Sequence, residues 1–195
     1  MQLGTYIIIG RSGSGKGTQA KLLIEEIKRR DQEHGVFYLE SGDGFRQLLT
    51  DDNLTAELAR QISDAGQLQP AFLAIHVWSH LFISNMKSNE HLVIDGTPRK
   101  LNEARILAGA LRFYGRIKPT VIYVDVSRKW ATERLLARHR SDDEIKNVEG
   151  RLNWFDTDVL PAIEYFRDEQ DFRVIDINGE QEIEKVHNEI ISKIF

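Results

Sequence analysis

Five short apolar runs alternate with longer stretches in which apolar and polar residues recur at helical spacing. Near-continuous apolar runs bounded by glycine or charged residues are typical of strands buried on both faces of a parallel sheet. Helical stretches between such runs indicate crossover connections. The pattern therefore predicts an α/β fold with a five-stranded parallel sheet between two helical layers. We expect strands at Thr5–Gly10, Val36–Glu40, His91–Asp95, Thr120–Val126 and Phe172–Ile177.

The stretches between and after these strands predict helices. Pro161 lacks an amide hydrogen, so we expect a kink where it interrupts the longest helix. The segment 41–69 is longer than a simple crossover and reads as a helical insertion at the carboxyl edge of the sheet, where such folds bind ligands. The expected helices are Lys16–Asp31, Gly44–Thr50, Leu54–Ala65, Pro70–Lys87, Asn102–Tyr114, Lys129–Arg138, Asp143–Glu169 and Glu180–Lys193.

A phosphate-binding loop is the clearest chemical signal in the chain. In "IIIGRSGSGKGTQAKLL", residues 7 to 23, Gly10, Gly15 and Lys16 fit G-x-x-x-x-G-K between an expected strand and an expected helix. Glycines let successive N–H groups turn inward around one oxyanion, and lysine and the helix N-terminus add positive potential. The alternative to a phosphate-binding loop is a glycine-rich turn that binds no ligand, and the strand–loop–helix context disfavours it. Gly17 stands where the usual loop has Ser or Thr, and Thr18 follows it.

Composition narrows the class of protein. The 195 residues carry a net charge of −4, which argues against a nucleic-acid polymer as the main partner. The absence of cysteine excludes disulfides, thiol catalysis and a cysteine zinc site, and it suits a reducing cytosol. No signal-peptide pattern opens the chain, and no apolar run approaches the roughly 18 residues of a membrane span. We therefore expect a cytoplasmic protein with no membrane partner.

Several motifs together resemble one enzyme family. The loop "SGSGKGTQ" is similar to G-x-P-G-x-G-K-G-T-Q of adenylate kinases and related nucleoside monophosphate kinases, with Ser12 in place of the proline. The segments "SGDGFR" (41–46), "GQLQP" (66–70), "DGTPR" (95–99) and "ERLLARHRSDD" (133–143) resemble further family motifs in the same order. The resemblance covers nearly the whole chain, and the joint order is far more specific than any single motif.

This resemblance implies a single P-loop kinase domain over 1–195, with a three-layer α/β/α fold. Residues 41–69 would be the insertion that binds the nucleoside monophosphate, and residues 138–143 a minimal lid. The implied activity is reversible transfer of the ATP γ-phosphoryl group to AMP, giving two ADP, by a monomer that uses Mg²⁺.

The resemblance also assigns roles to individual residues. Arginines are suited to such a site, because guanidinium groups stay charged and bind phosphate bidentately. Asp43 and Asp95 would reach Mg²⁺ only through water. The implied ATP-binding residues are Gly10, Ser12, Gly13, Ser14, Gly15, Lys16, Gly17, Thr18, Arg134 and Gly179. The acceptor-binding residues are Ser41, Gly42, Arg46, Gln67, Gln69, Gly96, Arg99, Glu103, Arg140 and Arg151. The catalytic residues are Lys16, Asp95, Arg99, Arg138, Arg140 and Arg151.

Three departures from the family keep alternatives open. Glu103 replaces a glutamine that reads adenine; a carboxylate accepts but does not donate, which suits GMP better unless Gln69 supplies an amide. The alternative for Glu103 is an exposed acid near a helix start. Thr97 replaces an aromatic residue, and the lid is very short. A GMP or pyrimidine monophosphate kinase remains possible, as does an ATP-binding switch protein.

Two histidines raise a separate question. His76 and His80 are one helical turn apart and could hold a metal, but no third ligand accompanies them. We expect them to pack in the core under the insertion.

Overall fold

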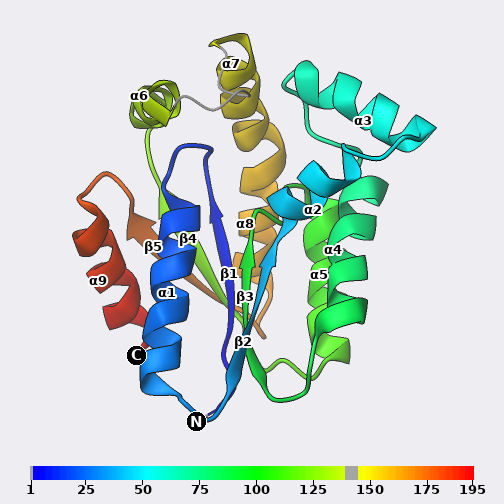
Figure 1. The fold of residues 1–195 in the computed structure, drawn as a ribbon. Helices are drawn as coiled ribbons and strands as arrows, with labels where there is room; N and C mark the ends of the chain where they lie inside the picture. The colour runs from blue at the N-terminus through cyan, green and yellow to red at the C-terminus, as the bar shows by residue number, and fades with distance from the viewer. Residues whose placement is uncertain (1, 139–144) are drawn as a thin grey trace.

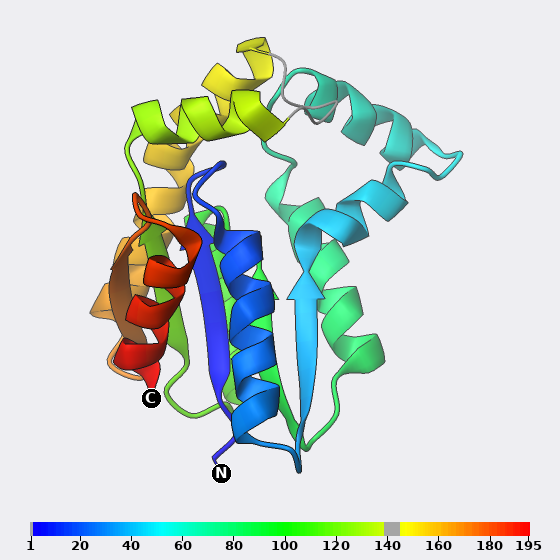
Figure 2. The same cartoon turned by 60° about the vertical axis from the view of Figure 1, so that its left-hand side comes forward.

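A five-stranded parallel sheet between two layers of helices forms the molecule, as Figure 1 and Figure 2 show. The computed structural model describes residues 2–138 and 145–195. The strand order is β2-β3-β1-β4-β5, and every neighbouring pair is parallel. The predicted α/β fold is confirmed, and each strand end lies within one residue of the expected one. The strands are β1 (Thr5–Gly10), β2 (Gly35–Glu40), β3 (Glu90–Asp95), β4 (Thr120–Asp125) and β5 (Arg173–Asn178).

Each face of the sheet has its own helical cover because alternate side chains of a strand point to opposite faces. In β1, Ile8 belongs to the cluster formed with α1 (Lys16–Arg30) and α9 (Ile183–Ile194). Its neighbour Ile7 belongs to the cluster formed with α4 (Ala71–Asn85), α5 (Leu101–Phe113) and α8 (Leu160–Asp168). This two-sided burial explains why the strands read as continuous apolar runs.

The insertion consists of α2 (Ser41–Leu48) and α3 (Leu54–Asp64). Here the predicted start at Gly44 was wrong, because β2 passes directly into α2 with Glu40 at the N-cap. Ser41 is buried in the first turn, and its hydroxyl donates to the Asp95 carbonyl at 3.4 Å. That contact ties the insertion to the end of β3.

The expected single helix Asp143–Glu169 is also corrected. Its start lies outside the described residues, and the rest consists of α7 (Ile145–Trp154), a π-helical turn η1 (Phe155–Val159) and α8. Pro161 falls in the first turn of α8, where a missing N–H is tolerated. Immediately before it, the Leu160 N–H donates to the Phe155 carbonyl five residues back. The irregularity near the proline is thus a π turn rather than a simple bend.

The histidine prediction was wrong. His76 and His80 are exposed on α4, and their rings stack with centroids 6.2 Å apart. Helix α4 buries the opposite face, with Trp78 and Phe82 in the core. Within the described part of the chain, no helix is long and apolar enough to cross a membrane.

Candidate active site

The P-loop joins β1 to α1 at the carboxyl edge of the sheet. Gly13 and Gly15 both have φ +86°, a left-handed conformation that side chains with a Cβ rarely adopt. The Ser14 N–H donates to the Arg11 carbonyl at 3.0 Å and closes the turn. Gly15 is the N-cap of α1, so the loop presents backbone N–H groups and a helix N-terminus to one point. This is the geometry of an anion site.

The loop is also packed against α6 (Arg128–Arg138). A Cβ added to Gly13 would lie 2.6 Å from the Ala131 carbonyl oxygen. Gly13 is therefore needed both for its backbone conformation and for the close approach of α6.

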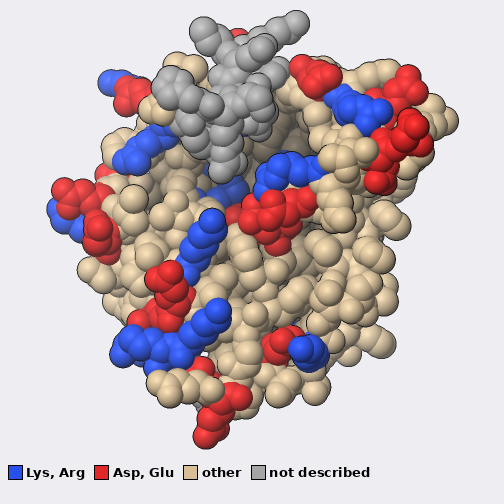
Figure 3. Space-filling model, in the orientation of Figure 1, with Lys and Arg blue, Asp and Glu red and all other residues tan. Residues whose placement is uncertain are grey.

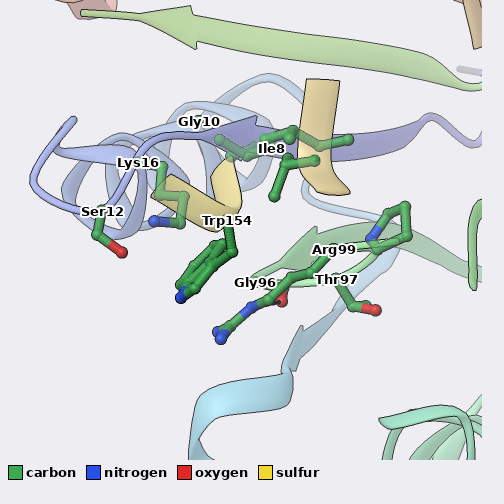
Figure 4. Close-up of a pocket in the computed structure, with 11 residues that line it drawn as sticks. Ile8, Gly10, Ser12, Lys16, Gly96, Thr97, Arg99 and Trp154 are labelled. Atoms are coloured by element: carbon green, nitrogen blue, oxygen red, sulfur yellow. Dashed lines mark hydrogen bonds between the residues drawn. The ribbon is translucent and has the colours of Figure 1, made fainter. Parts of the chain in front are cut away.

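A small cavity separates the P-loop from the end of β3, and Figure 4 shows the side chains that line it. Lys16 reaches into it from the start of α1, Arg99 from the loop after β3, and Trp154 from the last turn of α7. Two predicted catalytic residues that are 83 positions apart in sequence thus face one space. Figure 3 shows the molecule hollowed at this edge, with acidic and basic side chains mixed along the rim.

Arg99 is held in place from several sides. Its Nε donates to the Gly96 carbonyl at 2.7 Å, and its Cζ lies 5.8 Å from the centre of the Trp154 ring. Burial lowers the pKa of the Arg99 guanidinium, as does the nearby positive charge of Arg151, while Glu103 and Asp95 oppose the shift. Two neighbouring cations in a partly dry site favour a bound anion between them.

Predicted acceptor residues meet at the turn after β3. Gly96 has φ +83°, and a Cβ added there would lie 2.7 Å from the Ser41 Oγ. The same point is 3.5 Å from an Arg99 guanidinium nitrogen and 3.9 Å from the Gly42 backbone nitrogen. A glycine at this turn leaves room for the backbone donors and the guanidinium group to converge.

Asp95 has the contacts expected of a carboxylate that serves a bound cation. It is 6% exposed, and its Oδ2 accepts a hydrogen bond from the Tyr38 hydroxyl at 3.3 Å. Its Oδ1 is buried and has no hydrogen-bond partner among the described residues. A Cβ added to Gly17 would lie 3.3 Å from Oδ2, which places the carboxylate beside the P-loop. A free, buried carboxylate oxygen here fits hydrated Mg²⁺.

Arg46 and Asp43 pair with each other in α2. Arg46 also contacts Glu40 at 3.0 Å, and about two thirds of the Asp43 side chain is exposed. The hydrogen bond from Arg46 lowers the pKa of Asp43. Both residues are thus engaged within the insertion.

Glu103 is buried, so the alternative prediction of an exposed acid near a helix start was wrong. It is 2% exposed, and its Oε2 accepts from the Arg99 N–H at 3.0 Å and from the Thr97 hydroxyl at 3.3 Å. Burial raises the pKa of Glu103. The Gln69 amide nitrogen donates within the insertion, to the Ala59 carbonyl at 2.8 Å and the Ser63 hydroxyl at 2.9 Å. Gln67 is exposed.

The remaining predicted residues lie around the same edge or outside the described chain. Arg134 stacks on Trp130 in α6, with its Cζ 4.8 Å from the ring centre. Gly179 is buried beyond β5, and its N–H donates to the Asp125 carbonyl at 2.8 Å. Arg138 ends α6, and the predicted Arg140 and most of the predicted lid, 139–143, lie outside the described residues.

Sequence reasoning missed Trp154 and Arg11. The Trp154 Nε1 is buried without a hydrogen-bond partner among the described residues. Arg11 occupies a variable position of the loop motif, and only 8% of the residue is exposed. No sequence signal marks Arg11, because what distinguishes it is the burial of its charge, which a sequence does not show.

The adenylate kinase family model matches residues 8–171. An adenylate kinase of Oenococcus oeni is 30% identical over 175 residues, which cover 89% of each chain. Adenylate kinase 1 of Nostoc sp. is 31% identical over 185 residues, covering 94% of this chain and 95% of the relative. An adenylate kinase of Corynebacterium glutamicum is 29% identical over 93% of each chain.

Proposed function

Because the chain belongs to the adenylate kinase family, we propose that it transfers the γ-phosphoryl group of ATP reversibly to AMP, giving two ADP. The observation that carries the proposal is the cavity that Lys16 and Arg99 both line. One comes from a loop built for the phosphates of a donor, and the other follows a different strand. A cation on either side of one space suits a phosphoryl group that moves between two phosphates.

Positioning and charge stabilisation dominate phosphoryl transfer, because the reaction needs little covalent help from the protein. The backbone of 10–18 would hold the donor phosphates, with Lys16 on their terminal oxygens. Arg134 and Gly179 would flank the ATP base. An acceptor phosphate is already ionised at neutral pH, so no general base is required.

The acceptor phosphate would bind where Gly96, Ser41, Gly42 and Arg99 converge. Arg151 lies close enough to Arg99 for its charge to act on that group. Arg46 would leave its partners Glu40 and Asp43 to join them. Arg138 and Arg140 are assigned to the phosphates in transit from the family pattern alone.

Mg²⁺ would be held by Asp95 through bound water, and Asp43 is our second candidate. The Oδ1 of Asp95, which has no hydrogen-bond partner among the described residues, supports the first assignment. When bound with ATP, the ion would supply positive charge that offsets the negative charge of the phosphates. The protein's own part is to orient that ion and to keep the surroundings of the phosphates dry.

The test is transfer from Mg-ATP to AMP, GMP, CMP and UMP in parallel, by the full chain and by Lys16→Ala. We expect AMP to be the best acceptor and the variant to lose at least about 100-fold in kcat, since it loses charge at the transferring group. No transfer to any acceptor, with ATP still bound, would overturn the proposal and favour an ATP-dependent switch protein.

GMP is the second candidate acceptor because Glu103 is buried beside Thr97 and Arg99. A carboxylate there would accept from the ring N–H and amino group of guanine, both of which are donors. Glu103→Gln is the matched variant. If Glu103 reads the base, this change shifts the preference from GMP toward AMP; an unchanged preference assigns Glu103 to the turn alone.

A further inference from the structure

Arg11 is a P-loop residue whose side chain contacts Val126, Leu152 and Asp156 and does not line the cavity. It lies directly after Gly10, and only 8% of it is exposed. Its Nε donates to the carbonyl of Val126, just beyond β4, at 3.3 Å. A buried guanidinium group is costly unless it is fully paired, so its other partners matter.

Those partners belong to the end of α7 and the start of η1. The same segment carries Trp154 and Val159, which line the cavity. Arg11 donates to the Leu152 carbonyl at 3.3 Å and forms an ion pair with Asp156 at 2.9 Å. Its Cζ lies 4.3 Å from the centre of the Phe155 ring. These contacts cross more than 140 positions of sequence and involve the end of α7 and the start of η1. Trp154, which lines the cavity, lies between Leu152 and Phe155.

A second arginine provides a natural comparison. Arg128, in the first turn of α6, contacts the same Leu152 carbonyl at 3.2 Å and the same Asp156 carboxylate at 2.8 Å. Both arginines therefore share two acceptors, although Arg11 also donates to the Val126 carbonyl and Arg128 to the Asn153 side-chain oxygen at 2.7 Å. Arg11 is part of the P-loop, whereas Arg128 belongs to α6 and about half of its side chain is exposed. An effect special to Arg11 would come from its place in the P-loop, its burial and its own contacts with Val126 and Phe155.

We propose that Arg11 is a positioning residue, which fixes α7 against the P-loop so that Arg151 and Trp154 stay in register with the donor phosphates. The inference rests on the proposed transfer activity. A misplacement of about 1 Å remote from the reacting atoms can cost roughly 100-fold in rate, so a rigid link between the two walls of the cavity has kinetic value. The Asp156 carboxylate serves as the common anchor.

The experiment compares Arg11→Met with Arg128→Met. Methionine keeps an unbranched apolar side chain and removes the charge and all the donors. We expect Arg11→Met to lower kcat by at least about 10-fold while the dissociation constant for ATP changes less than about threefold, because the loop N–H groups remain. Arg128→Met should leave kcat within about twofold while lowering Tm, since it gives up the two acceptors that Arg128 shares with Arg11.

Two further measurements separate positioning from simple support of the fold. Asp156→Asn added to Arg11→Met should lower kcat little further, because both changes break one link. In ¹H–¹⁵N spectra, the Trp154 indole signal, assigned with Trp154→Phe, should shift when a diadenosine polyphosphate binds. That shift should shrink in Arg11→Met and persist in Arg128→Met.

Equal kcat losses in the two arginine variants would overturn the proposal. So would a loss in Arg11→Met that appears entirely as weaker ATP binding, since Arg11 would then only shape the loop. The wild-type rate is measured alongside, so an inactive parent chain would count against the proposed function instead. In that case the indole response still reports on Arg11.

Discussion

The buried polar groups at the two ends of strand β3 differ in how completely they are hydrogen-bonded. At its start, His91 and Asp31 form a network in which both ring nitrogens of His91 and both carboxylate oxygens of Asp31 have hydrogen-bond partners. At its end, Asp95 keeps one carboxylate oxygen without any partner among the described residues. Both aspartates are 6% exposed, so burial does not separate them. The difference indicates that the start of β3 stabilises the fold, whereas the end of β3 binds a ligand.

The Asp31 network is closed. Its carboxylate accepts from the His91 Nε2 at 3.1 Å, the His34 Nδ1 at 2.9 Å and the backbone N–H groups of Glu33 and His34. The His91 Nδ1 in turn accepts from the Gly4 N–H at 2.9 Å. Burial alone would raise the pKa of Asp31, but the hydrogen bonds from His34, His91 and Glu33 outweigh it and hold that pKa well below its usual range.

By residue type and distance these groups could hold a metal, because their potential ligand atoms lie within 4.8 Å of one another. The hydrogen bond from Gly4 argues against it. Since the His91 Nδ1 accepts, the proton of the neutral ring is on Nε2, the atom that a metal would need. We therefore assign the Asp31, His34 and His91 cluster a structural role, in contrast to Asp95. Variants at the two ends of β3 test this difference.

The largest expected effect comes from Asp95→Asn. Losing the charge that faces the P-loop should lower kcat by about 100-fold and raise the Mg²⁺ concentration needed for half-maximal rate, because outer-shell groups of a metal site have effects of this order. Tm should stay level or rise, since the change removes a buried charge whose Oδ1 has no hydrogen-bond partner among the described residues. Rates measured across a Mg²⁺ titration test this, and a large fall in Tm would contradict it.

Asp31→Asn should give the reverse pattern. Its NH₂ group would face N–H donors, so we expect Tm to fall by roughly 5 °C or more, while kcat at a temperature where the variant is folded stays within about threefold. Thermal unfolding followed by circular dichroism measures the first quantity. A selective loss of rate with unchanged Tm would assign a catalytic role to this end of the sheet.

The gap in stability between the wild type and Asp31→Asn should depend on pH. A carboxyl whose pKa is lowered in the folded state stabilises it above the unfolded pKa of about 4, and this contribution is lost as the pH falls through the folded value. The gap should therefore be full at pH 7 and narrow below about pH 4. Urea unfolding at several pH values checks this; a constant gap would mean that ionisation of Asp31 is not involved.

The smallest expected effect is that of added Zn²⁺. If the cluster is purely structural, micromolar Zn²⁺ should change the Tm of the wild type no more than that of His34→Gln, which lacks one candidate ligand. Both shifts should stay within about 1 °C of each other. A larger stabilisation confined to the wild type would show that a metal can displace the proton on His91.

The fold was predictable because its signals are local. Buried strands appear as apolar runs, and a P-loop needs only a few adjacent residues such as Gly15 and Lys16. The α2 start and the π turn at Phe155–Val159 were missed, because both depend on contacts with other elements. Propensity within a segment does not reveal them.

The site was predictable only as far as motifs extend. The motifs named Lys16, Arg99 and Asp95, and the structure brings these three to one edge of the sheet. Arg11 and the Asp31 network escaped notice because their partners are distant in sequence. The positions of charged residues in a sequence do not indicate which of them will be buried together.

The strand order also has a consequence for how the chain folds as it is synthesised. In the native sheet β2 pairs with β3, and β1 pairs with β3 and β4. The first two strands therefore have no native partner until β3 emerges, so the P-loop is translated long before the sheet that supports it can form. Such non-local pairing slows folding and leaves apolar strands exposed while the chain grows. The first half of the nascent chain would need protection from aggregation. This need decreases once β3 is complete, because β1 and β2 can then pair with it.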